Sequence, residues 1–250
     1  MDLLTFFLFA VTVFCGAVTQ AVCGFGFGVL VMSVLPYFMP SYIGALVPCG
    51  LMGTSITLYL SLRRVRNIRW KLVAGPLVAS TITCWLSTRY LKVLSDTVLR
   101  GALGVFLVGL SAVHFLARAK QKRKPSVPRS VVAGCAAGVT DALFGMGGPP
   151  VASYLLSVTD DKDTYLTNLS CVFAVLCINT TLTRAVSGMI TLDALKNYLV
   201  GMIFVAAGLA VGGRIFYKIS QKTLEKLVYC FFTVSGTIMV GWTAFTLLTA

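Results

Sequence analysis

Long runs of apolar residues, separated by short polar segments, recur along the chain from Leu3 to Leu248. A run of 18 or more residues with few charges is typical of a transmembrane helix, because about 20 apolar residues cross the hydrocarbon core. Charged residues form only 12% of the chain, whereas a soluble domain carries about a quarter. The sequence therefore predicts an all-α integral membrane protein and disfavours a soluble helical core.

Two of the apolar runs are broken by glycine-rich segments that match each other. Residues 18–28 read VTQAVCGFGFG, and residues 139–150 read VTDALFGMGGPP. When the two segments are aligned, five positions are identical, and Gln20 of the first corresponds to Asp141 of the second. A broken apolar segment that recurs about half a chain apart indicates an internally duplicated membrane transporter.

The chain divides into two halves with the same order of elements. The segment 118–129 carries six basic residues and two prolines, and it marks the boundary between the halves. We expect an N-terminal repeat at 1–117 with a hairpin tip at 23–28, and a C-terminal repeat at 130–250 with a hairpin tip at 145–150. Each repeat would contain a glycine-broken hairpin and three transmembrane helices, which gives about eight full spans. The expected helices are 42–62, 72–88 and 101–117 in the first repeat, and 165–186, 194–213 and 227–248 in the second.

The distribution of Lys and Arg discriminates between two ways of threading the broken segments. If each segment enters and leaves on one side as a hairpin, the loops on one side of the membrane hold 16 basic residues and those on the other hold 5. If each segment crosses once as a kinked span, the split is 13 against 8. Lys and Arg favour cytoplasmic loops, so the hairpin arrangement is preferred. It predicts two inverted repeats, both termini outside, and a cytoplasmic linker at 118–129.

Inverted hairpins would bring their tips together near the middle of the membrane. Glycines let backbone N–H groups approach a ligand, and helix N-termini attract anions. The tips are therefore a candidate site for a small anion, with close helix packing through small residues as the alternative. The candidate substrate-binding residues at the tips are Thr19, Gln20, Gly24, Gly26, Thr140, Asp141, Gly145, Gly147 and Gly148.

Asp141 is the only acidic residue deep inside an apolar segment. A carboxylate there is costly, so a functional role is the default expectation. Three roles are open: a coupling residue for a proton or a cation, a hydrogen-bonded support for its own loop, and a partner of Arg184. Arg184 lies near the end of its span, where snorkelling to the interface is an alternative. Thr19 and Thr140 either contact substrate or bond back to the helix backbone, and Asn179 is a candidate for lining the pathway.

Several other classes of site find little support. The formal net charge is +13, but the basic residues lie in short loops, which argues for membrane topology and against nucleic-acid binding. The eight cysteines form no C-x-x-C pair and there is one histidine, so we expect no metal site and no cofactor. An intramembrane thiol enzyme that uses Cys23 at the first tip, and an anion channel, remain alternatives to a transporter.

The two broken segments, Gln20–Gly28 and Asp141–Pro149, resemble those of the sulfite exporter TauE/SafE family of membrane permeases, as do the basic linker and the duplicated layout. The resemblance implies a non-enzymatic exporter of a small sulfur-containing or organic anion, such as sulfite, thiosulfate or a sulfonate, in the bacterial inner membrane. We expect alternating access around the two tips in a multi-pass protein.

The chain departs from the family pattern at the second tip, where family members often have three consecutive glycines. Here Gly147 and Gly148 are followed by Pro149 and Pro150, and the first proline removes one N–H group from the tip. The expected partners are the anion and the lipid bilayer. Proton or sodium coupling, a homodimer, the identity of the anion and the direction of transport stay open.

Overall fold

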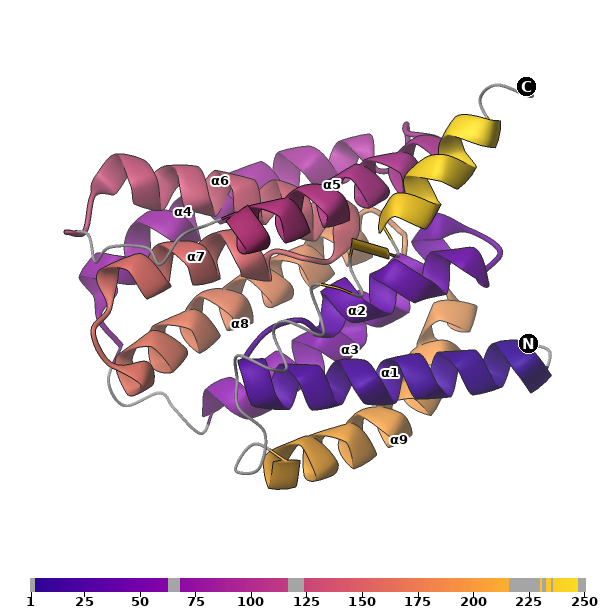
Figure 1. Ribbon diagram of the computed structural model, residues 1–250, viewed down its shortest axis with the longest axis horizontal. Helices are drawn as coiled ribbons and strands as arrows, with labels where there is room; N and C mark the ends of the chain where they lie inside the picture. The colour runs from indigo at the N-terminus through magenta and orange to yellow at the C-terminus, as the bar shows by residue number, and fades with distance from the viewer. Residues whose placement is uncertain are drawn as a thin grey trace. The chain divides into compact units, whose positions relative to one another are not determined.

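The computed structural model describes residues 3–62, 68–116, 124–215, 230, 233–234 and 236–246. These residues contain helices and no β-strand, which confirms the predicted all-α class (Figure 1). Within them, four helical segments are long and apolar enough to cross a membrane: Leu3–Val22, Tyr42–Leu62, Thr164–Val186 and Leu192–Arg214. The molecule is therefore a helical membrane protein. Eight spans and inverted repeats stay predictions.

The helices follow the predicted segments closely. In chain order they are α1 (Leu3–Cys23), α2 (Phe27–Val34), the 3-10 helix η1 (Leu35–Tyr37), α3 (Tyr42–Leu62), α4 (Trp70–Tyr90), α5 (Asp96–Leu116), α6 (Val127–Phe144), α7 (Gly148–Val158), α8 (Lys162–Val186) and α9 (Leu192–Ile215). Of the last predicted span, 227–248, the stretch 236–246 is helical. Residues 118–123 of the predicted linker lie outside the described part of the chain.

Glycines with left-handed backbone conformations produce both breaks. Gly24 has φ 79°, Gly26 has φ 111° and Gly145 has φ 67°. Other residues would lose about 1–2 kcal/mol in this conformation, so glycine is the residue that commonly ends a helix there. The second break is shorter than the predicted 145–150, because α7 begins at Gly148 and takes both prolines into its first turn. Proline suits that position because its missing N–H group would have no intrahelical acceptor.

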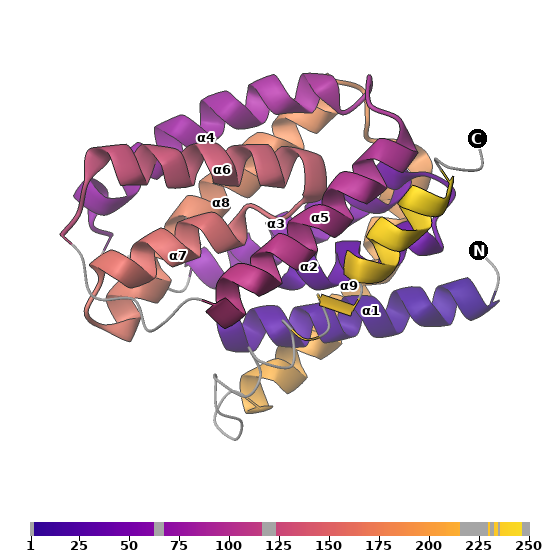
Figure 2. The ribbon, with the colours of Figure 1, turned by 45° about the horizontal axis from the view of Figure 1, so that its top comes forward.

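The described residues form two compact units. The first draws on 1–49, 93–118 and 192–250, and the second on 50–92 and 119–191. In the first unit α1 packs against α2 and α9. In the second unit α4 packs along α6 and α8, and α7 packs against α6 and α8 (Figures 1 and 2). The division into two repeats joined by a linker stays a prediction.

In the second unit, α6 and α7 run side by side in opposite directions (Figure 2). A cavity of about 490 Å³ lies along the pair. One end is lined by Pro128 from the start of α6 and Ser157 from the end of α7, while Ala136 and Pro150 line it nearer the turn. The broken segment is therefore a helical hairpin within this unit.

In the first unit, α2 folds back on α1 in the same manner. A Cβ atom placed on Gly16 would lie 2.9 Å from a methyl of Val31 and 3.1 Å from the ring of Phe27. The returning helices contain 8 residues in α2 and 11 in α7, which corresponds to about 12 and 17 Å at 1.5 Å per residue. Neither helix can cross a hydrocarbon core of about 30 Å by itself.

Candidate functional site

The Asp141 carboxylate lies at the turn of the second hairpin and is bonded within the protein. Asp141 is 7% exposed and belongs to the last turn of α6. Its Oδ1 accepts the backbone N–H of Gly147 at 3.1 Å, and its Oδ2 accepts the hydroxyl of Thr180 on α8. Because Gly147 directly precedes α7, the carboxylate lies where the helix dipole stabilises negative charge.

Few backbone donors remain at the start of α7 for an external anion. Among its first three residues, Pro149 and Pro150 carry no N–H group, so Gly148 alone supplies a donor. The Gly147 N–H already bonds to Asp141. When Asp141 is ionised, its carboxylate therefore occupies the position at the second tip that an external anion would take.

Arg184 binds the other side of the same turn. Its Nη2 donates to the backbone oxygens of Asp141 at 2.9 Å and Ala142 at 3.0 Å, which are carbonyls in the last turn of α6. The oxygen of Asp141 also accepts the N–H of Gly145 at 2.9 Å. Arg184 is 2% exposed, so the snorkelling alternative is wrong. Gly50 of α3 makes room for it, since a Cβ atom there would lie 2.2 Å from Nη1.

Thr180 connects the carboxylate to two further groups. Its hydroxyl oxygen lies 2.9 Å from the backbone oxygen of Leu176 and 3.2 Å from the thiol of Cys84 on α4. Thr180 and Arg184 are four residues apart on α8, so they share one face of that helix. The prediction of site residues missed Thr180. A polar pair at this spacing on an otherwise apolar span is the signal that could have found it.

The two candidate threonines bond to backbone oxygens. Thr140 Oγ1 lies 2.8 Å from the oxygen of Ala136 and 3.2 Å from that of Met146, so it links α6 to the turn. Thr19 donates to the oxygen of Cys15 at 2.9 Å. Both contacts agree with the back-bonding alternative.

The first tip is built by the same arrangement with a neutral side chain. Gln20 is 6% exposed, its Oε1 accepts the N–H of Phe27 at 3.0 Å, and its Nε2 donates to the oxygen of Gly24 at 3.4 Å. Gln20 thus caps α2 as Asp141 caps α7. Gly28 and Val29 in the first turn of α2 keep their N–H groups, since neither is proline.

Asp141, Gly147, Thr180 and Arg184 together form what we call the Asp141 cluster. The remaining candidates are not part of it. Asn179 points to α4, where its Nδ2 donates to the oxygen of Thr81 at 3.4 Å. The side chain of Cys23 lies outside the part of the molecule that the structure describes. A search of the described residues finds no group of His, Cys, Asp and Glu that could hold a metal ion.

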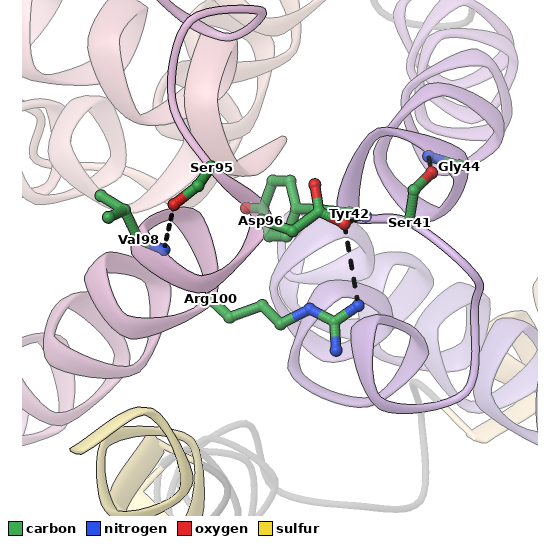
Figure 3. Close-up of polar contacts among 7 residues, drawn as sticks. All are labelled: Ser41, Tyr42, Gly44, Ser95, Asp96, Val98 and Arg100. Atoms are coloured by element: carbon green, nitrogen blue, oxygen red, sulfur yellow. Dashed lines mark hydrogen bonds and ion pairs between the residues drawn. The ribbon is translucent and has the colours of Figure 1, made fainter. Parts of the chain in front are cut away.

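A second carboxylate cluster, in the first unit, caps two helices (Figure 3). Asp96 in the first turn of α5 accepts the N–H of Tyr42 at 2.8 Å, and Arg100 lies 3.9 Å from the same carboxylate oxygen. The hydroxyls of Ser41 and Ser95 accept N–H groups in the first turns of α3 and α5. These contacts fix the helix starts, which is the usual role of N-cap residues.

Comparison with known proteins identifies one family. The family model described as "Sulfite exporter TauE/SafE" matches residues 8–239, which include both hairpin tips and the Asp141 cluster. Comparison with curated proteins and with solved structures gives no significant match.

Proposed function

The chain belongs to the sulfite exporter TauE/SafE family, and we propose that it is a secondary transporter that exports a small sulfur-containing or organic anion, such as sulfite, thiosulfate or a sulfonate. The family match over residues 8–239 carries this proposal. Because this is a family of transporters, the match is consistent with our expectation that the protein is not an enzyme. We place it in the bacterial inner membrane as a multi-pass protein.

The first tip supplies the anion contacts in this proposal. Its capping residue, Gln20, is neutral, so the positive end of α2 carries no compensating charge from within the hairpin. The N–H groups of Gly28 and Val29 add donors. An anion without a fixed basic partner can leave again, as a transport cycle requires.

In this proposal the second tip controls the change of access from one side of the membrane to the other. Its own carboxylate already compensates α7, and α8 holds the turn through Thr180 and Arg184. In the proposed cycle the tips are exposed to one side of the membrane and then to the other. A movement of α8 would carry the second tip with it, because the side chains of α8 bond to both the carboxylate and the backbone of the turn.

Reconstituted protein tests the proposal. Liposomes that contain the purified chain are loaded with labelled sulfite, thiosulfate or a sulfonate, and efflux is followed against protein-free liposomes. We expect efflux that saturates with concentration and releases the anion chemically unchanged. Flux that rises without saturation would indicate a channel. Altered sulfur chemistry that disappears in Cys23→Ala would indicate a thiol enzyme, and no flux of any of the three anions would refute the proposal.

A further inference from the structure

We propose that the cavity between α6 and α7 is a binding groove for an anionic phospholipid of the surrounding membrane. The lipid phosphate lies beside Arg129 at the open end of the hairpin, and an acyl chain lies between the two helices. The inference goes beyond the proposed function, because it concerns a lipid that stays with the protein and not the anion that is exported.

Two rows of residues with the same spacing line the groove (Figure 2). In each row the residues follow one another at i, i+3, i+4 and i+7, so each row occupies one face of its helix. A row of this length extends about 10 Å along the helix axis, at 1.5 Å per residue. The rows are Arg129, Val132, Ala133 and Ala136 on α6, and Pro150, Ser153, Tyr154 and Ser157 on α7.

The walls of the groove suit a hydrocarbon chain. Ala133 and Ala136 carry only a methyl group, which leaves the space of about 490 Å³ between the helices. The Ser157 hydroxyl donates to the backbone oxygen of Tyr154 at 2.7 Å, and the Tyr154 hydroxyl is hydrogen-bonded to the side chain of Ser130. These polar groups therefore bond within the hairpin. A polar solute in such a space would lose hydrogen bonds to water, whereas an acyl chain has none to lose.

The open end of the groove is basic. Arg129 is exposed, and it is the one charged residue among the described residues of the lining. It belongs to the segment 118–129, which holds six basic residues, whereas the facing loop at 159–163 holds three acidic residues and one lysine. One of the three acids, Asp161, is engaged as the cap of α8, where it accepts the N–H of Thr164 at 2.6 Å. The charge balance favours an anionic headgroup, and a guanidinium can bind a phosphate through two parallel hydrogen bonds.

The groove has the polarity of a lipid molecule along its length. Arg129 and Ser157 lie at the open end, whereas Ala136 and Pro150 lie toward the turn. Charge at one end and apolar walls beyond it match a headgroup followed by its chain. Basic pockets between membrane helices on the cytoplasmic side commonly bind anionic headgroups, and the Lys and Arg distribution predicts the cytoplasmic side for this end. The lipid would contact both helices of the hairpin and so stabilise it.

Native mass spectrometry of the purified protein in a neutral detergent tests the recognition of the headgroup. The probes are phosphatidylglycerol and phosphatidylcholine with the same acyl chains, and we expect the wild type to retain phosphatidylglycerol in preference. Arg129→Gln should bind phosphatidylglycerol about fivefold more weakly, the effect of one basic residue beside an anionic lipid surface. The matched control is Arg214→Gln, which removes an exposed charge at the end of α9 and should bind like the wild type. No preference in the wild type, or an equal loss in both variants, would overturn the inference.

A second pair of variants tests where the chain lies. Ala136→Leu fills the groove and should lower the retention of phosphatidylglycerol, whereas Val139→Leu, at a 37% exposed position outside the lining, should not. Phosphatidylglycerol should also raise the melting temperature of the wild type, because a ligand of the folded state stabilises it, and this shift should be smaller in Ala136→Leu.

Three results of these measurements would overturn the assignment of a lipid. Unchanged lipid retention in Ala136→Leu would mean that the chain does not lie in the groove. A change in oligomeric state in Ala136→Leu without a change in lipid retention would mean that a second copy of the chain occupies the groove. An equal melting shift with inorganic phosphate would mean that the site binds a free anion. If Ala136→Leu does not fold, Arg129→Gln, at an exposed position, still decides the question.

Discussion

At the level of single residues, the two hairpin tips use one capping arrangement with two different charges. Gln20 accepts the N–H of Phe27, and Asp141 accepts that of Gly147. The longer side chain of Gln20 reaches one position farther along the chain than Asp141 does. The backbone turn is thus supported alike in both tips. The difference lies in the electrostatic potential at the start of the second helix of each hairpin.

The substitution Gln20→Glu should weaken anion transport by placing a carboxylate at the start of α2. The change is nearly isosteric and preserves an acceptor for the N–H of Phe27, so the fold should survive. We expect the KM for a sulfonate to rise about tenfold, which corresponds to about 1.4 kcal/mol. The measurement is concentration-dependent efflux from liposomes. Gln20→Met, which removes the acceptor without adding charge, is the control. An equal KM in Gln20→Glu and the wild type would refute an anion site at the first tip.

At the level of helices, α6 packs against α4 through glycines that leave no room for a side chain. A Cβ atom on Gly138 would lie 2.4 Å from the backbone oxygen of Ser80 and 2.9 Å from the backbone nitrogen of Cys84. Close approach through small residues is typical of helix pairs in membranes. Backbone atoms cannot move aside without separating the two helices, and α6 carries Asp141.

The substitution Gly138→Ala should therefore lower the free energy of unfolding by about 1–3 kcal/mol, the usual range for overpacking. The matched control is Gly109→Ala in α5, where a Cβ atom would meet no atom within 4 Å. There the better helix propensity of alanine should raise the free energy of unfolding, by at most about 1 kcal/mol. Denaturant titration of both variants in detergent makes the comparison. Equal stability of the two would contradict the close packing of α4 and α6.

The start of α8 depends on a titratable cap. Asp161 accepts the backbone N–H of Thr164 at 2.6 Å, and hydrogen bonds from Thr164 lower the pKa of Asp161 below its ordinary value of 3.8. A lowered folded pKa gives stability that is present above the unfolded value and is lost as the pH falls through the folded value.

Asp161→Ala should consequently melt at a lower temperature than the wild type at pH 7, with a difference that shrinks below about pH 4 as the cap is protonated. Thermal melts of detergent-solubilised protein at pH 7 and pH 3 check this. A difference that is the same at both pH values would mean that the ionised cap does not stabilise α8.

The sequence was sufficient to predict the helices and the positions where they break, since both depend on local chemistry. Apolar length predicted the helices. The pattern of Gly24, Gly26 and Gly145 predicted where the chain turns, because left-handed backbone is costly for other residues. The partners of Asp141 were predictable only in part, since Arg184 was one of three open alternatives and Thr180 was missed. Thr180 lies 39 residues from Asp141 and Arg184 lies 43 from it, so only the packing of α8 against the hairpin brings them together.

At the level of the whole molecule, the basic residues decide how the chain is threaded. The hairpins seen within each unit correspond to the arrangement in which 16 basic residues face one side and 5 face the other. This arrangement predicts that Lys124 and Asp160, which flank the second hairpin, lie on the cytoplasmic side. A single kinked span would place them on opposite sides. Asp193, before the next basic loop, should face outward.

Single cysteines at these three positions, introduced after the eight native cysteines are replaced, can be labelled with a membrane-impermeant maleimide. Cysteines at 124 and 160 should react in inside-out vesicles and stay unlabelled in intact spheroplasts, while a cysteine at 193 should show the reverse. The reason is energetic, because positive charges resist translocation far more than acidic ones do, so the acidic loop at 159–163 does not oppose the assignment. Labelling of 160 from outside, with 124 still labelled from inside, would mean that the second broken segment crosses the membrane. The two repeats would then not be inverted.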